Sequence, residues 1–242
     1  MRVRSLQVQE QLVEDRQAFV SPHRRIVTGG DTLGPMPRTQ EALARLVSRE
    51  GVSDRIVAAF REVDRQGFVP DDQRSIAYED RPVRLPKEQT TSQPSLIARM
   101  IDAVEPKSSD RALEVGTGFG FQTALLARLV DRVFSIDRHE ELVQGARANL
   151  ERAGIEGVEV VVGDGWKGVP EHAPFDVIIV SASASDFPDD LGDQLNEDGR
   201  MVIPLAGSFG DAVMTFVKRD GTVQRGHLVT PARFVPLVKG TG

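Results

Sequence analysis

Short apolar runs alternate with amphipathic segments from residue 111 onward, and this alternation limits the possible fold more than any other sequence feature. Residues 121–130 and 139–154 have the helical spacing of apolar side chains. Around them, four runs rich in β-branched and apolar residues predict buried strands: 111–115, 132–137, 158–164 and 175–182. Strands that alternate with helices predict an α/β fold, namely a doubly wound, mostly parallel sheet with helices on both faces.

A C-terminal antiparallel hairpin is predicted beyond this region. Residues 199–206 predict one further strand, and residues 212–229 predict two strands that turn at Asp220-Gly221. An Asp-Gly pair between alternating apolar residues is a strong short-range signal for a hairpin. The sheet should therefore end in antiparallel strands.

A small helical N-terminal lobe is predicted ahead of the sheet. Residues 39–51 and 53–68 each predict a helix, with Thr39 and Ser53 as the capping residues. The preceding segment mixes Pro, Gly and Arg, which predicts a poorly ordered tail or a linker; one short amphipathic helix near its start is the alternative. The expected divisions are a leader at 1–40, a helical lobe with the loop that follows it at 41–98, and a nucleotide-binding domain at 99–242.

Composition excludes several classes of protein. The 242 residues are 40% apolar and 27% charged, which is ordinary for a soluble globular protein. With no Cys and four scattered His, the sequence offers no thiolate nucleophile and no metal site, and neither residue is expected to titrate at the active site. A net charge of −6 disfavours nucleic acid as a partner. No apolar run is long enough to span a membrane and no signal-peptide core is present, so we expect a cytoplasmic protein.

A glycine-rich turn joins the first predicted strand to its helix in the stretch LEVGTGFGF. A doubly wound sheet binds nucleotides at the carboxyl ends of its strands, where glycines allow the backbone to approach the ligand. Asp137 ends the next strand, about twenty residues on, where a carboxylate accepts the ribose hydroxyls of an adenosine ligand. A plain tight turn and a surface aspartate are the alternatives. Together the two features predict an adenosine site.

The spacing of the glycines favours one adenosine ligand over another. A dinucleotide turn needs a small residue at its third position, where this chain has Phe121. Glycines at 116, 118 and 120 after Glu114 instead follow the pattern of S-adenosylmethionine sites. Asp164-Gly165, after the third strand, could accept from the adenine amino group, although such a pair is more often a simple turn. NAD is therefore disfavoured and S-adenosyl-L-methionine is the expected cofactor.

With these residues in view, the sequence resembles the protein-L-isoaspartate O-methyltransferases from about residue 52 to 238. The stretches that carry the resemblance are REVDRQGFVP, EQTTSQP, LEVGTGFGFQTALLA, VVGDGWKGVPEHAPFDVIIVSA, GRMVIP and RFVPLV. The resemblance implies a Rossmann-like class I methyltransferase. It also implies methylation of the α-carboxylate of L-isoaspartyl residues in damaged proteins and peptides, which initiates repair through a succinimide.

The same resemblance implies roles for individual residues. Ser92 would hydrogen-bond and orient the substrate carboxylate, which needs no base because it is already ionised at neutral pH; a helix N-cap is the alternative role for Ser92. The substrate would contact Val235, Pro236 and Leu237. The cofactor would be bound by Gln89, Thr90, Thr91, Glu114, Gly116, Thr117, Gly118, Asp137, Arg138, Asp164 and Gly165.

Three departures from the family pattern concern the range of substrates. Pro86 and Glu88 stand where the family has two glycines, Ser183 and Ser185 stand where Ala and Pro are common, and the leader is additional. They leave open a dedicated enzyme that tailors one peptide or protein by succinimide formation. A cofactor-binding module without activity and a dehydrogenase are the further alternatives. The sequence gives no oligomeric state.

Overall fold

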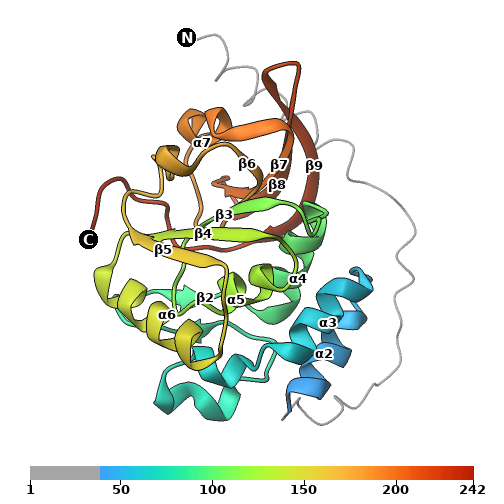
Figure 1. Ribbon diagram of the computed structural model, residues 1–242, viewed down its shortest axis with the longest axis vertical. Coiled ribbons are helices and arrows are strands. Elements are labelled where there is room, and N and C mark those ends of the chain that lie inside the picture. The colour runs from blue at the N-terminus through green and yellow to red at the C-terminus, as the bar shows by residue number, and fades with distance from the viewer. Residues whose placement is uncertain (1–38) are drawn as a thin grey trace. The chain divides into compact units, whose positions relative to one another are not determined.

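The structure of the protein is a computed structural model in which residues 39–242 are described, so the predictions for the leader lie outside the described residues. A seven-stranded sheet of order β5-β4-β3-β6-β7-β8-β9 forms its centre (Figure 1). Strands β3 to β7 pair in parallel, and β7-β8 and β8-β9 pair antiparallel. The bounds are β3 Arg111–Val115, β4 Arg132–Asp137, β5 Val158–Val162, β6 Phe175–Val180, β7 Leu195–Leu205, β8 Asp211–Arg219 and β9 Thr222–Ala232.

Six helices and a small hairpin complete the described part of the chain. The helices are α2 Gln40–Ser48, α3 Asp54–Glu62, α4 Pro94–Ala103, α5 Phe121–Ala127, α6 Glu140–Arg152 and α7 Asp189–Asp193. Short 3₁₀ segments cover Arg65–Phe68, Asp71–Ile76 and Pro170–His172. The two-residue strands β1 Val83–Arg84 and β2 Thr90–Thr91 form the separate hairpin.

The strand order creates a switch point beside β3. From β3 the chain moves outward through β4 to β5, and it then returns to the other side of β3 with β6 and β7. Loops that leave neighbouring strands in opposite directions open a crevice at the carboxyl ends of those strands. The ends of β3 and β6 are therefore the place where a ligand site is expected.

Alternation along the strands places two hydrophobic clusters on opposite faces of the sheet. In β6, Val177 and Ile179 belong to the cluster that includes side chains of α2 to α6, whereas Ile178 and Val180 belong to the cluster that includes α7. Both sets are fully buried, as expected for parallel strands covered on both sides. The predicted lobe helices α2 and α3 thus share one cluster with the sheet.

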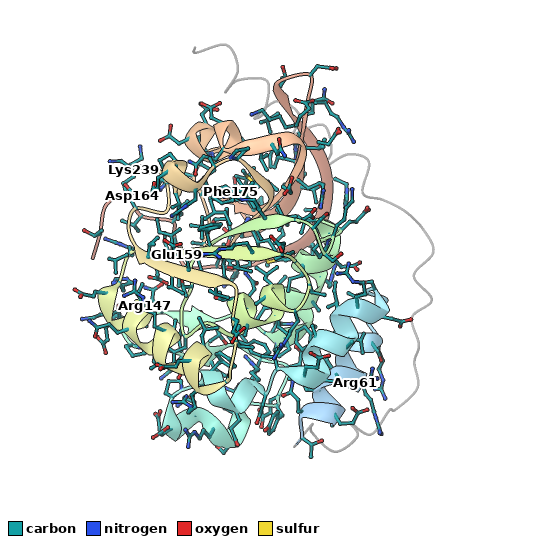
Figure 2. All side chains as sticks on the ribbon, in the orientation of Figure 1. Arg61, Arg147, Glu159, Asp164, Phe175 and Lys239 are labelled. Atoms are coloured by element: carbon teal, nitrogen blue, oxygen red, sulfur yellow. The ribbon has the colours of Figure 1, made fainter. Side chains whose placement is uncertain are left out.

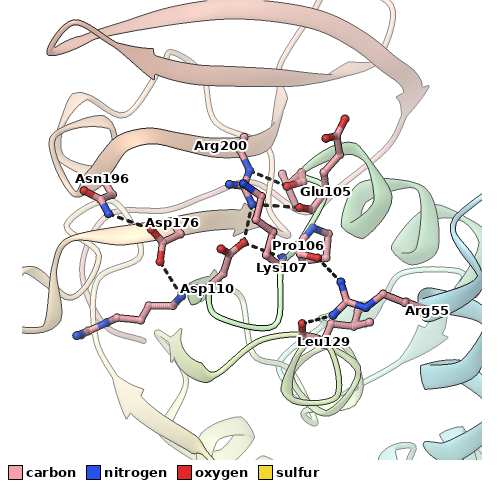
Figure 3. A network of polar contacts seen from close by, with 11 residues as sticks. Arg55, Glu105, Pro106, Lys107, Asp110, Leu129, Asp176, Asn196 and Arg200 are labelled. Atoms are coloured by element: carbon pink, nitrogen blue, oxygen red, sulfur yellow. Dashed lines mark hydrogen bonds and ion pairs between the residues drawn. The ribbon is translucent and has the colours of Figure 1, made fainter.

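The amino ends of the strands are held by a polar network on the side away from the switch point (Figure 3). Asp110, directly before β3, accepts a hydrogen bond from Arg200 Nη2 in β7 at 2.5 Å. Arg200 also donates to the carbonyls of Val104 and Glu105 behind α4. Arg55 in α3 donates to the carbonyls of Pro106 and Leu129. These contacts attach α3 and α4 to the sheet at the amino ends of its strands, away from the switch point.

The predicted strands, the C-terminal hairpin and the helices predicted at 39–51, 121–130 and 139–154 are confirmed with shifts at their ends. The helix predicted at 53–68 ends at Glu62 as α3, and a separate 3₁₀ segment, Arg65–Phe68, follows it. Strand β7 begins at Leu195 rather than at 199, and α5 ends at Ala127. Thr39 caps α2 through Ala42 N as expected, but the Ser53 side chain makes no capping bond, and Ser53 N instead donates to Asp102 Oδ1 at 2.9 Å. No helix between residues 39 and 242 is long and apolar enough to cross a membrane.

Candidate active site

The glycine turn after β3 is held open by backbone conformations that L side chains rarely adopt. Gly116, Gly118 and Gly120 have φ of 99°, 55° and 88°. A Cβ on Gly116 would lie 3.3 Å from Ser181 Cβ, and one on Gly118 would lie 3.1 Å from Leu85 Cδ1. The turn therefore needs glycine both for its shape and for the close approach of its neighbours.

Asp137 fixes this turn from the end of β4. Its Oδ2 accepts from Gly118 N at 2.9 Å and its Oδ1 accepts from His139 N at 3.0 Å. The side chain is nearly buried, and burial raises the pKa of Asp137 while the two backbone donors oppose that shift. The carboxylate is thus positioned by the backbone and still lines the crevice.

Glu114 lies under the turn as a fully buried carboxylate. It accepts from Ser135 Oγ at 2.7 Å, from Gln122 Nε2 at 3.0 Å and from Thr123 Oγ1. Burial raises the pKa of Glu114 to about 7 against these three donors, which favour the charged form. These donors lie in β4 and at the start of α5, so Glu114 joins β3 to the two elements that follow it in the chain.

A pH-dependent stability follows from this carboxyl group. Because the pKa of Glu114 is higher in the folded state than its ordinary 4.5, its stabilising effect is complete below pH 4.5 and is lost as pH rises through 7. We expect the unfolding free energy of the wild type relative to Glu114→Gln to fall by on the order of 2–3 kcal/mol from pH 4.5 to 7.5. Denaturant titrations across this range measure it. Glu50→Gln, at an exposed position, is the control. A pH-independent difference for Glu114→Gln would contradict the assignment.

The hairpin β1-β2 covers the glycine turn. Its tip has Leu85 N donating to Gln89 O at 2.8 Å, with Lys87 and Glu88 at φ of 60° and 56°. Two left-handed residues between paired strands are the geometry of a type I′ turn, which favours Asn and Gly. Lys87 Nζ also lies 3.4 Å from Glu141 Oε2 in α6. The chain therefore forms this turn with Lys87 and Glu88, although glycine would adopt the same positive φ at a lower cost in free energy.

The Arg65 side chain binds the segment that carries Ser92. This guanidinium is fully buried and donates to the carbonyls of Ala77, Glu79, Arg81 and Ser92 and to Thr91 Oγ1, at 2.9–3.2 Å. Burial lowers the pKa of Arg65 to about 10, so the group stays charged at neutral pH. One cation thus orders the loop from residue 77 to residue 92.

Ser92 is not the N-cap of the following helix, so that alternative reading is wrong. Helix α4 begins at Pro94 with Gln93 at the cap position, and its amino end is instead bound by Asp80 Oδ1, which accepts from Ser95 N at 2.9 Å. Within residues 39–242 the Ser92 hydroxyl makes no hydrogen bond. Its side chain is available to a ligand.

The segment 233–237 passes over the end of β6. Ser183 N donates to Val235 O at 2.8 Å, and Leu237 N donates to Ser183 O at 2.7 Å. The Asp211 carboxylate connects the two segments. Its Oδ1 accepts from Ser183 Oγ at 2.8 Å, and its Oδ2 accepts from Phe234 N at 2.7 Å. Ser183, a departure from the family pattern, therefore contributes a hydroxyl that holds this segment in place.

A first pocket lies between the hairpin, the glycine turn and segment 233–237. All but two of the predicted site residues line it: Gln89, Thr90, Thr91, Ser92, Gly116, Thr117, Gly118, Asp137, Arg138, Gly165, Val235, Pro236 and Leu237. Glu114 is buried beneath it. Asp164 (Figure 2) is also outside the lining, and its carboxylate accepts from Trp166 N at 3.0 Å.

A second pocket adjoins the first on the side of α4 and β9. The two share Thr90, Ser92, Ser181 and Val235, so these residues form the junction between them. Arg99 and Arg233 line the second pocket and no carboxylate does. Although the protein carries a net charge of −6, this pocket is suited to an anionic ligand.

Sequence reasoning missed several residues of the site. Ser181, Gln122, Leu85 and His139 line the first pocket without having been predicted. Ser181 could have been found, because it lies at the carboxyl end of the predicted strand 175–182, which faces the crevice. Gln122 and Leu85 carry no such signal. Among the described residues no group of three or more His, Cys, Asp or Glu side chains could hold a metal ion.

A doubly wound, mostly parallel sheet with a glycine turn at its switch point and an acid after the next strand is the Rossmann-like arrangement of class I methyltransferases. A model of the protein-L-isoaspartate(D-aspartate) O-methyltransferase family matches residues 38–242. The chain therefore belongs to this family, and the protein is a methyltransferase.

Individual relatives agree with this membership. A protein-L-isoaspartate O-methyltransferase from Methanoculleus marisnigri is 43% identical over 206 residues, which cover 84% of this chain and 93% of that relative. Protein-L-isoaspartate O-methyltransferase 2 from Pelobacter propionicus is 43% identical over 215 residues, which cover 86% and 96% of the two chains.

Two solved structures are similar as well. One is a protein-L-isoaspartate O-methyltransferase with a TM-score of 0.76 at 32% identity, covering 84% of this chain and 67% of that chain. The other, from Plasmodium falciparum, is described as a protein-L-isoaspartate O-methyltransferase in complex with S-adenosyl-L-homocysteine. It has a TM-score of 0.71 at 26% identity and covers 84% of this chain and 99% of that chain. The family model, which matches residues 38–242, spans every residue that lines the two pockets.

Proposed function

We propose that the protein methylates the α-carboxylate of L-isoaspartyl residues in proteins and peptides, with the cofactor in the first pocket and the substrate residue in the second. The junction of the two pockets at Ser92 carries this proposal, because a methyl group must pass from one ligand to the other at such a point. The cationic lining of the second pocket supports an anionic substrate.

The first pocket fits S-adenosyl-L-methionine. Gly116 and Gly118 leave room that a Cβ would fill, and Asp137 offers a carboxylate to ribose hydroxyls. When bound, this cofactor supplies an electrophilic methyl group, which the carboxylate oxygen accepts as the carbon–sulfur bond breaks and the electron pair stays on sulfur.

The protein itself orients the substrate carboxylate and removes it from water. The substrate carboxylate is ionised at neutral pH, so no side chain has to remove a proton from it. Ser92 donates a hydrogen bond to this carboxylate and fixes the direction of attack. The hairpin and segment 233–237 cover the junction and exclude water, which strengthens the hydrogen bonds made there. Alignment of the two reactants is the largest contribution available to such a site.

The expected result is methyl transfer to an isoaspartyl peptide well above transfer to the matched aspartyl peptide. The test uses S-adenosylmethionine labelled in its methyl group and counts the base-labile label in each peptide. The aspartyl peptide is the control, since it differs only in which carboxyl group joins the backbone. Equal labelling of both peptides, or labelling of neither by a protein that binds the cofactor, would contradict the proposed function.

A general repair role and a cytoplasmic location belong to this proposal. Support for general repair comes from the family match. A panel of unrelated isoaspartyl peptides separates the two roles. Comparable rates across the panel are expected, whereas activity on a single sequence would favour a dedicated tailoring enzyme.

A further inference from the structure

Ser181 stands at the junction of the two pockets on the wall opposite the loop of Ser92. It directly follows β6, and its backbone N donates to Val115 O at 2.8 Å, which continues the pairing of β6 with β3. Its Cβ would be 3.3 Å from a Cβ on Gly116, so it faces the glycine turn closely. Both pockets are lined by Ser181, as they are by Ser92.

The Ser181 hydroxyl already receives a hydrogen bond. Gln122 Nε2 lies 2.9 Å from Ser181 Oγ and 3.0 Å from Glu114 Oε1. An amide nitrogen carries two hydrogens, and one goes to each of these oxygens. Glu114 Oε1 and Ser181 Oγ both accept from this nitrogen, so Gln122 directs its amide nitrogen, rather than its oxygen, toward both groups.

Because the Ser181 oxygen accepts from Gln122, the hydrogen of the Ser181 hydroxyl is left to donate to another acceptor. In the described chain no acceptor takes it, just as no partner takes the hydrogen of Ser92. Two hydroxyl donors, Ser181 directly after β6 and Ser92 directly after β2, therefore lie at the junction where the carboxylate must bind. A carboxylate has two oxygens, and each accepts readily from a separate donor.

We propose that Ser181 donates a second hydrogen bond to the carboxylate that receives the methyl group, and that Gln122 directs this donation. The inference rests on the proposed function, since it assigns a contact to that substrate. Two donors on opposite walls fix the plane of the carboxylate as well as its position. Ser181 is then a substrate-contacting residue, and Gln122 is a positioning residue that acts through it.

The test compares Ser181→Thr with Ser181→Val, which have nearly the same shape and differ in the hydroxyl group. The threonine variant is expected to keep activity within about threefold of the wild type. The valine variant, and Ser181→Ala, should lose about ten- to a hundredfold in kcat/KM for the isoaspartyl peptide, as expected for one hydrogen bond to a charged group. Ser185→Ala, an exposed serine of the same segment, is the matched control.

Two calorimetric measurements separate this role from others. The affinity for S-adenosylhomocysteine alone should be unchanged in all four variants. The affinity of the isoaspartyl peptide for the enzyme loaded with S-adenosylhomocysteine should fall only in Ser181→Val and Ser181→Ala, which lack the hydroxyl at position 181. Equal activity of the threonine and valine variants, or a loss explained by weaker cofactor binding, would overturn the inference while leaving the proposed function intact. A wild type that binds the cofactor but does not methylate the peptide would overturn both.

Discussion

Arg65→Met is expected to lower the free energy of unfolding by about 2–4 kcal/mol, which corresponds to a fall in melting temperature of about 5–15 °C. The substitution keeps the buried volume but removes the donor for four carbonyls and for Thr91 Oγ1. Buried acceptors without donors are costly, and no other arginine or lysine between residues 39 and 242 is buried. Thermal and denaturant unfolding measure the loss.

The same variant should lose methyl transfer more than it loses cofactor affinity. Ser92 O is one of the acceptors, so the hydroxyl beside it is no longer held at the junction. Arg65→Lys keeps the charge on a single nitrogen that cannot reach all five acceptors, and it should recover less than half of the stability. Arg61→Met, at an exposed arginine of α3 (Figure 2), is the control and should change stability by less than about 1 kcal/mol. A stable, fully active Arg65→Met variant would refute this role.

Asp137→Ala is expected to weaken S-adenosylhomocysteine binding about ten- to a hundredfold. A charged acceptor for the ribose hydroxyls is lost, which corresponds to about 1.5–3 kcal/mol. The backbone donors Gly118 N and His139 N lose their partner as well, so the glycine turn is released from β4. Isothermal calorimetry measures the affinity, and circular dichroism checks that the fold is intact.

Two further variants sharpen this measurement. Asp137→Asn keeps one acceptor oxygen without the charge and should fall between wild type and Asp137→Ala. Asp131→Ala removes an exposed carboxylate just before β4, at the other end of the strand, and should leave the affinity unchanged. An Asp137→Ala protein that is folded and binds with wild-type affinity would remove Asp137 from the cofactor site.

The parts of the site that depend on local sequence could be predicted from it. Gly116, Gly118 and Asp137 lie at fixed distances from strand ends, and strand ends follow from apolar runs, so their meeting in one pocket was expected. The sheet and its terminal hairpin followed from the same alternation. The segment 233–237 was recognised only through resemblance to the family, because its sequence has no periodic signal.

Residues whose role depends on contacts between distant segments were not predicted. Arg65 looks like any charged residue near the end of the predicted helix 53–68, and only the path of residues 77–92 around it makes it a buried donor. Gln122 is one polar residue in an otherwise apolar helix start, and its importance depends on Glu114 and Ser181 lying on either side. Ser92 was open to a capping role because the sequence does not reveal that Asp80 binds the amino end of α4.

The turn at Lys87 and Glu88 has a consequence for how long a bound cofactor stays. Each residue is held in the left-handed region at a cost of about 1 kcal/mol, which is recovered when the hairpin lifts and both return to negative φ. The exposed Lys87–Glu141 pair opposes this only weakly. Opening should therefore be easier than in a Lys87→Gly, Glu88→Gly variant, whose glycines adopt positive φ without this cost, and stopped-flow release of S-adenosylhomocysteine should be slower from that variant. We expect strain at the hairpin tip to shorten the time for which the spent cofactor stays bound.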